Sequence, residues 1–157
     1  MNKIIFKIIL IQFIGCVFFI KGIQKLYLVI QNEKYNCFLE SFDNPNCECL
    51  DRLHLSENLA KFIGDCYAWF FYSFIFGMIL IGLINRIKKR HYLNTILLFV
   101  LLYLLFLIRF FRNGEVNLVF NQIGLLFTKD IGAQNLIGGI VYTLIGSLIF
   151  WKSYRME

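Results

Sequence analysis

Three long stretches of this chain carry no charged side chain: residues 66–84, 92–108 and 131–151. A helix needs about 20 mostly apolar residues to cross the hydrocarbon core of a bilayer, because each residue advances it by about 1.5 Å. Of the 157 residues, 59% are hydrophobic and only 17% are charged. A soluble bundle of this size has too little interior for helices that are apolar all round. The runs therefore predict membrane-spanning helices.

The N-terminal segment is also apolar, and its basic start followed by an apolar stretch up to Ile20 imitates a secretory signal. However, no small-x-small cleavage pattern precedes Lys21, and the residues after Cys16 stay apolar, unlike the start of a mature lipoprotein. We interpret residues 4–23 as a retained helix, with Lys7 reaching out to the membrane surface. The sequence thus predicts one all-α domain, residues 1–157, built as an antiparallel membrane bundle of four helices near 4–24, 61–86, 92–111 and 132–151.

Charged residues between the predicted helices and near their ends are distributed unequally over the two sides of the predicted bundle. The predicted outer loop, residues 27–60, holds six acids against Lys34 and Arg52, a net charge of −4 (2 − 6). The other side holds eight basic residues against Glu157: Lys3, Lys7, Arg86, Lys88, Lys89, Arg90, Lys152 and Arg155.

An excess of Lys and Arg in short loops marks the cytoplasmic face of a membrane protein. Both termini are therefore expected in the cytoplasm, with the acidic loop outside. The expected location is the inner (plasma) membrane of a bacterium or, alternatively, the mitochondrial inner membrane. The net charge of +6 is a topology signal, and no nucleic-acid partner is expected, because no basic stripe with stacking aromatics stands free of the membrane.

Three of the five cysteines lie in the outer loop, in the segment YNCFLESFDNPNCECLDRL. Disulfides persist outside the cytoplasm, and the Asp-Asn-Pro-Asn turn residues 43–46 can bring the loop ends together. We expect a structural disulfide from Cys37 to Cys47 or Cys49, with Cys66 as a further candidate. A loop of this size would stabilise the fold by about 3 kcal/mol. Cys16 has no apparent thiol partner and is expected to pack as a small apolar residue.

Two other interpretations of the loop cysteines stay open. Cys47 and Cys49, separated by one residue, can form an easily reduced pair that a third thiol resolves. Alternatively, Cys37, Cys47, Cys49 and His54 are a possible ligand set, although zinc ligands are usually paired two to four residues apart. The sequence itself assigns no metal, no cofactor and no catalytic residue, and an enzyme is not the favoured class.

The interiors of the predicted spans lack ionisable side chains, which argues against an ion-coupled carrier. Small residues instead recur at helical spacing and predict where helices pack closely in lipid: Gly15, Gly22, Gly139, Thr143 and Ser147. One further segment, residues 115–127, is too short to span and too apolar for an exposed loop. We expect it to be an interfacial or re-entrant segment on the outer face.

The end of the first predicted helix reads FFIKGIQKLYLVIQNEKY. With Gly22, Lys25 and Leu26 at matching positions, it resembles the DoxX and MauE-type family of small four-helix membrane proteins. The resemblance implies an accessory protein of redox or disulfide maturation in a bacterial membrane. Thiol-bearing members of that family carry cysteines around the third helix and its following loop, and this chain has none there.

Two functions are consistent with these features. The first is an accessory membrane protein, redox-associated or not, that assists maturation or assembly of another membrane or exported protein. The alternative is a non-catalytic structural subunit of a larger membrane complex. In both cases the expected partners are the lipid bilayer and other membrane protein subunits.

Overall fold

The structure, a computed structural model, describes residues 5–44, 46–107 and 115–156, and every regular element in these ranges is a helix. The all-α class predicted from the apolar runs is therefore confirmed. The elements are α1 (Phe6–Ile30), α2 (Asn32–Asp43), α3 (Glu48–Arg52), α4 (Leu55–Ile87), α5 (Tyr92–Leu107), α7 (Glu115–Leu125) and α8 (Ile131–Arg155).

Three of these helices are long and apolar enough to cross a membrane: Phe6–Ile30, Asn58–Ile87 and Ile131–Arg155. They correspond to the first, second and fourth predicted spans. The third predicted span is represented by the shorter apolar helix α5, because the predicted end near residue 111 lies outside the described residues.

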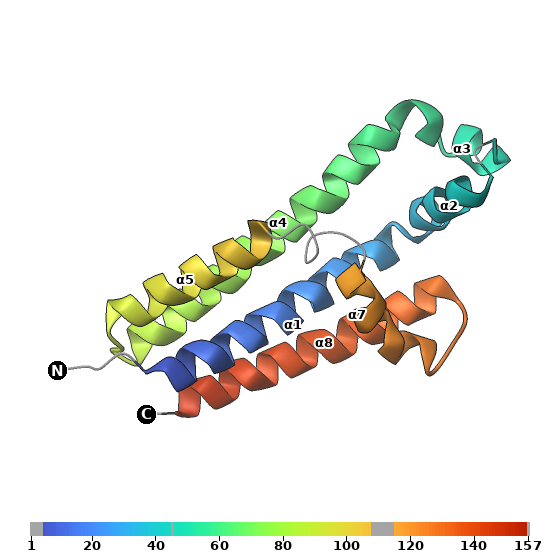
Figure 1. The fold of residues 1–157 in the computed structure, drawn as a ribbon. Coiled ribbons are helices and arrows are strands. Elements are labelled where there is room, and N and C mark those ends of the chain that lie inside the picture. The colour runs from blue at the N-terminus through green and yellow to red at the C-terminus, as the bar shows by residue number, and fades with distance from the viewer. Residues whose placement is uncertain (1–4, 45, 108–114, 157) are drawn as a thin grey trace.

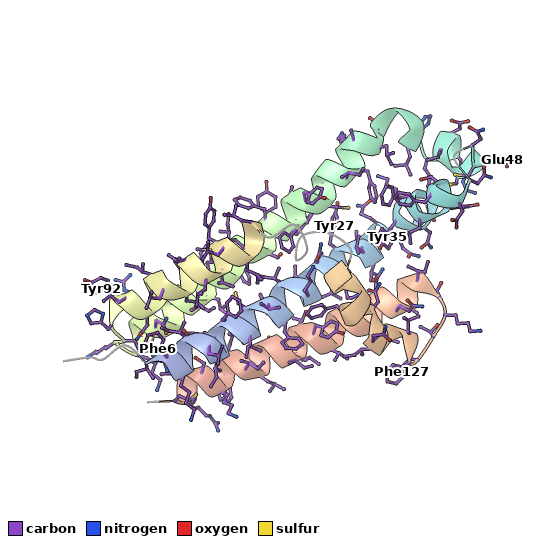
Figure 2. The ribbon with its side chains drawn as sticks, viewed as in Figure 1. Phe6, Tyr27, Tyr35, Glu48, Tyr92 and Phe127 are labelled. Atoms are coloured by element: carbon purple, nitrogen blue, oxygen red, sulfur yellow. A yellow bond between two sulfur atoms is a disulfide. The ribbon has the colours of Figure 1, made fainter. Side chains whose placement is uncertain are left out.

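The long helices lie side by side and alternate in direction (Figure 1). Helix α1 is central: it packs along α8 on one side and contacts α4 and α5 on the other. The start of α1, the turn between α4 and α5 and the end of α8 gather at one end, while α2 and α3 lie at the opposite end. Figure 2 shows the same separation, with Phe6 and Tyr92 far from Glu48. The main apolar core joins α1, α4, α5 and α8 through residues such as Ile20, Phe70, Ile81, Leu98 and Phe150.

The segment predicted as the outer loop, residues 27–60, is largely helical. Helix α1 continues to Ile30, α2 and α3 follow, and α4 already begins at Leu55. Helix α2 ends where the amide of Asn44 donates to the carbonyl of Glu40, just before Pro45 in the sequence. A residue before proline is disfavoured in the α conformation, which explains the stop.

The predicted interfacial segment 115–127 forms helix α7 and the turn after it, and α7 packs on α8. Phe120 is buried against Phe18 of α1 and Tyr142 of α8, with ring centroids 5.8 and 4.8 Å away. Asp130 then starts α8 as its N-cap, accepting a 2.7 Å hydrogen bond from the amide of Ala133.

Candidate functional site

The three cysteines of residues 27–60, the segment predicted as the outer loop, lie close together at the end of the molecule formed by α2 and α3. Cys37 lies in the middle of α2, Cys47 directly precedes α3, and Cys49 lies within α3. Cys37 and Cys49 form a disulfide with their Cα atoms 5.8 Å apart. This is one of the two pairings that the sequence left open.

The third cysteine is in contact with this disulfide. The Cys47 Sγ atom lies 3.1 Å from the Cys49 Sγ atom, and Cys47 is a free thiol. All three sulfurs lie within 4.8 Å of one another. Cys37 and Cys47 are buried, with 3% and 5% of their surface exposed, and Cys49 is half-buried. The arrangement brings a nucleophilic atom next to a bond that it can attack.

A small apolar core supports the cysteines from the side of α4. Leu55 and Phe62 of α4 are buried against Cys37 and Cys47, and Cys66 is a half-buried free thiol that packs against the same core. Burial raises the pKa of the Tyr35 hydroxyl, and the nearby Cys66 thiol adds to this effect. Cys66 is thus a neighbour of the cluster, although it is not bonded to it.

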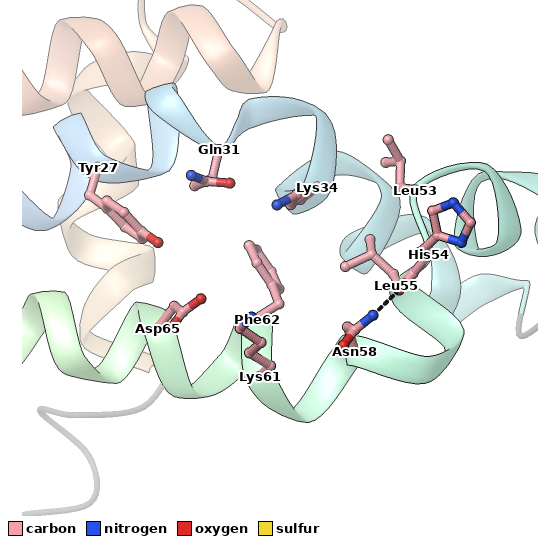
Figure 3. A pocket seen from close by; sticks show the side chains of 10 residues that line it. All are labelled: Tyr27, Gln31, Lys34, Leu53, His54, Leu55, Asn58, Lys61, Phe62 and Asp65. Atoms are coloured by element: carbon pink, nitrogen blue, oxygen red, sulfur yellow. Dashed lines mark hydrogen bonds between the residues drawn. The ribbon is translucent and has the colours of Figure 1, made fainter.

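Two hollows open near this end. One is lined by Cys47 and Cys49 together with polar residues of α2, α3 and the turn between them: Glu40, Asn44, Asn46, Glu48 and Arg52. The other lies between α1 and α4, where Tyr27, Asp65 and His54 line it (Figure 3). His54 adopts a left-handed backbone conformation with φ of 51° and is one of the residues at the edge of this second hollow. In the described part of the chain, no histidine or carboxylate joins the three sulfurs, so the four-ligand set with His54 is not assembled.

No protein-family model, curated protein or solved structure matches this chain. The function must therefore be inferred from the arrangement of its own residues.

The small residues predicted to pack helices lie mostly in one seam between α1 and α8. A Cβ atom on Gly22 would meet the backbone nitrogen of Thr143 at 2.5 Å and the carbonyl oxygen of Gly139 at 3.0 Å. A Cβ atom on Gly15 would meet the side chain of Ile149 at 2.8 Å. These residues let the two backbones touch.

Ser147 lies apart from this seam. Its side chain is exposed and lines a shallow apolar groove with residues of α4. Gly146, the residue before it, takes the place in the seam that the spacing assigned to Ser147: a Cβ atom there would meet the backbone nitrogen of Phe19 at 2.7 Å.

Two lysines of α1, Lys21 and Lys25, are buried inside the helical body, because α1 continues past them to Ile30. Lys21 is 1% exposed; it donates to the Gln24 side-chain oxygen at 3.2 Å and lies over the Phe70 ring. Lys25 is 6% exposed and donates to the side-chain oxygens of Asn121 and Asn135, at 2.5 and 3.1 Å. The sequence contained only a weak indication that Lys25 would be buried: two asparagines in other apolar segments, Asn121 and Asn135, that could accept its hydrogen bonds.

Apart from the contacts of the two buried lysines, a second cluster of polar side chains joins the helices at the end of the molecule far from the cysteines. Gln12 of α1 and Asn85 of α4 exchange two side-chain hydrogen bonds of 2.8 and 3.2 Å. Arg90 donates to Asn85 and to the carbonyls of Ser153 and Met156 at the end of α8, at 3.0, 2.6 and 2.7 Å. Partial burial lowers the pKa of Arg90, yet its charge suits the carbonyl-rich end of a helix. This cluster is structural: its polar atoms face one another across three helices.

Proposed function

We propose that this chain is an integral membrane protein whose three loop cysteines exchange disulfides with a membrane or exported partner, as an accessory of that partner's maturation. One observation carries the proposal: the free Cys47 thiol lies 3.1 Å from a sulfur of the Cys37–Cys49 disulfide. A purely structural bridge does not need a third sulfur in contact with it.

The contact supports a balanced exchange sequence. A thiolate of the partner attacks one sulfur of the Cys37–Cys49 bond and forms a mixed disulfide, which releases the other cysteine as a thiolate. The partner's second thiolate then attacks the mixed disulfide, so the partner leaves with a disulfide and the cluster keeps two extra electrons. Cys47 supplies a competing route, because its thiolate can displace the partner from Cys49 and form a Cys47–Cys49 bond instead.

Access to the sulfurs comes from the hollow that Cys47 and Cys49 share with charged residues. The carboxylates of Glu40 and Glu48 and the guanidinium of Arg52 line its wall. A polar peptide segment of a partner can therefore pair with these charges while its thiol approaches Cys49. The buried side of the cluster, towards Leu55 and Phe62, remains closed.

The membrane arrangement that accompanies this proposal is a four-helix antiparallel bundle, in which α5 crosses the membrane as the third span along the chain, in addition to α1, α4 and α8. Basic residues collect at the end that holds the α4–α5 turn and the end of α8, and acidic residues collect around the cysteines. By the positive-inside rule, the cysteine end faces outward and both termini face the cytoplasm of a bacterium. A mitochondrial inner membrane is the alternative location. The resemblance to DoxX and MauE-type proteins implies the same arrangement of four membrane-spanning helices with both termini in the cytoplasm.

A second candidate function is a non-catalytic subunit of a larger membrane complex. Leu125, at the end of α7, and Leu126 and Phe127, in the turn after it, are 51%, 80% and 70% exposed although they lie outside the long apolar helices. Consecutive exposed apolar residues mark a surface that contacts a membrane or a protein. This observation is compatible with disulfide exchange as well, since an accessory protein also docks on its client.

Peptide mapping of the purified oxidised protein tests the exchange. Held at mildly alkaline pH without added oxidant, the wild type should redistribute its bond among Cys37–Cys49, Cys37–Cys47 and Cys47–Cys49. It should also oxidise a synthetic dithiol peptide. Blocking or replacing Cys47 (Cys47→Ser) should hold the bond at Cys37–Cys49 and slow resolution of the mixed disulfide at least tenfold, whereas Cys66→Ser should behave as the wild type. A single fixed linkage, together with a mixed disulfide that resolves no faster in the wild type than in Cys47→Ser, would refute the proposal.

A further inference from the structure

We propose that the same three cysteines, when reduced, form a binding site for a single copper(I) ion held by three thiolates. The basis is geometric: the Sγ atoms of Cys37, Cys47 and Cys49 lie within 4.8 Å of one another and come from two segments that fold together. The inference concerns the reduced state of the cluster. It does not require that the oxidised state exchange disulfides with a partner.

The triangle of sulfurs has nearly the size that a metal ion requires. With metal–sulfur bonds of about 2.3 Å, an ion at the centre of three sulfurs places them about 4 Å apart. In the oxidised protein Cys47 and Cys49 are already 3.1 Å apart, and reduction opens the Cys37–Cys49 edge. After reduction, the Cys47–Cys49 edge needs to lengthen by about 1 Å and the Cys37–Cys49 edge by about 2 Å to reach a trigonal site.

The protein around the cluster keeps the triangle together without the covalent bond. Cys37 on α2 and Cys49 on α3 belong to one apolar core with Leu55 and Phe62 of α4. The Cys49 sulfur also approaches the backbone carbonyl of Cys37 at 3.8 Å. A site that is assembled before the ion arrives loses less conformational entropy on binding.

The ligand set selects the ion. Soft thiolate ligands favour copper(I), zinc and iron–sulfur clusters. Structural zinc sites take four ligands in a tetrahedron, and among the described residues only three sulfurs are available, with His54 at the edge of a different hollow. Three sulfurs, two of them on residues with 5% or less of their surface exposed, suit a low-coordinate soft ion sheltered from water.

Oxidation and metal binding exclude each other. A dithiol reductant supplies the two electrons and two protons that convert the Cys37–Cys49 bond to two thiols, and is itself oxidised to a disulfide. Copper(I) then replaces the protons of Cys37, Cys47 and Cys49, so three protons are released for each ion bound. In the reverse exchange, the disulfide form of the dithiol takes back the two electrons and is reduced, while Cys37 and Cys49 are oxidised to their disulfide, which removes two of the three ligands and expels the ion.

The test uses full-length protein in mild detergent, reduced with a phosphine, and titrated with copper(I) in competition with a chromophoric copper(I) chelator. We expect one ion per chain, three sulfur ligands at about 2.3 Å by X-ray absorption, and at least 100-fold weaker binding to the oxidised protein. Cys47→Ser retains two thiols and should lose at least 100-fold in affinity. Cys66→Ser and Cys16→Ser should bind as the wild type does.

Several results would overturn the copper site. They are tight binding that persists in Cys47→Ser, equal binding by the oxidised protein, or a preference of the reduced protein for zinc over copper(I). Circular dichroism and elution volume identify a variant that has lost its fold. If Cys47→Ser is such a variant, Cys37→Ser provides a second comparison between a chain with all three proposed ligands and a chain with two. Because the exchange experiment uses oxidised, metal-free protein, failure of one proposal is distinguishable from failure of the other.

Discussion

The α1–α8 seam and the cysteine end are held together in different ways. In the seam, glycines bring backbone against backbone, as where a Cβ atom on Gly146 would lie 2.7 Å from the amide nitrogen of Phe19 and 2.9 Å from the carbonyl oxygen of Gly15. At the cysteine end, short helices are joined by one disulfide and a few apolar side chains around Leu55 and Phe62.

The contrast indicates where the molecule can change. Backbone atoms in contact along two long helices cannot change rotamer as side chains can, so the seam has little room to rearrange. Sulfur atoms can exchange bonding partners at little cost, because a disulfide between one pair replaces a disulfide between another. We therefore place chemistry at the cysteine end and rigidity in the seam.

Adding one methyl group to the seam should have the largest effect. In Gly22→Ala the new Cβ atom meets the backbone of Thr143 and Gly139, which cannot move as a side-chain tip would. We expect a loss of about 4 kcal/mol in unfolding free energy, above the usual cost of overpacking. Unfolding in mixed micelles, followed by circular dichroism, measures it.

Gly64→Ala is the matched control, because a Cβ atom at Gly64 of α4 meets nothing within 4 Å. It should be neutral or stabilise by up to about 1 kcal/mol through its higher helix propensity. Similar losses for the two variants would show that backbone contact does not distinguish the seam from the rest of the molecule.

Breaking the disulfide should have the next largest effect, and the effect should be local. Cys37→Ser removes a bridge that spans 12 residues in sequence, which is worth about 3 kcal/mol. Hydrogen exchange should accelerate in α2 and α3 and remain unchanged in α8. Cys47→Ser, which keeps the bridge, should lose less than about 1 kcal/mol, since it exchanges one small side chain at the wall of a polar hollow. Equal acceleration in α8 would contradict the division into two regions.

The long apolar helices were predictable because their signal is local. Runs without charge lie in α4, α5 and α8, and length alone identifies them as helices. Helices α2 and α3 were missed because residues 32–52 mix charges with few apolar side chains and contain Pro45. The small core with Leu55 and Phe62 stabilises these helices, and that core exists only after the chain has folded back.

The site was predictable to the level of residue type and no further. Clustered thiols in a polar segment indicated a disulfide, but spacing could not choose between Cys47 and Cys49, which differ by two positions. The burial of Lys25 could not be predicted either, because its partners Asn121 and Asn135 are 96 and 110 residues away in sequence. Such pairings depend on how helices rotate against one another, which hydropathy does not report.

Removing Arg90 should weaken the end of the molecule opposite the cysteines. Arg90→Ala deletes hydrogen bonds to Asn85 and to two carbonyls at the end of α8. Charge-assisted hydrogen bonds contribute more than neutral ones, but this side chain is only partly buried, so we expect a loss of about 2 kcal/mol. Arg86→Ala, an exposed arginine in the last turn of α4, is the control and should cost less than about 0.5 kcal/mol. Thermal unfolding of the two variants measures the difference. If Arg86→Ala lowered the melting temperature as much as Arg90→Ala, the effect would come from the loss of one positive charge and not from the hydrogen bonds of Arg90.

The smallest effect is a pH dependence that belongs to the cysteine end. Burial raises the pKa of Tyr35, with a further contribution from the Cys66 thiol, above the value of about 10 in an unfolded chain. Above pH 10 the unfolded chain therefore binds fewer protons than the folded one, and stability falls as the pH rises further. Tyr35→Phe should remove this part of the alkaline loss, and the difference in ultraviolet absorption between wild type and Tyr35→Phe should titrate above pH 10. Cys66→Ser should move that midpoint back towards 10. A difference spectrum that titrates at or below pH 10 would mean that Tyr35 is solvated, and that the core behind the sulfurs is open rather than closed.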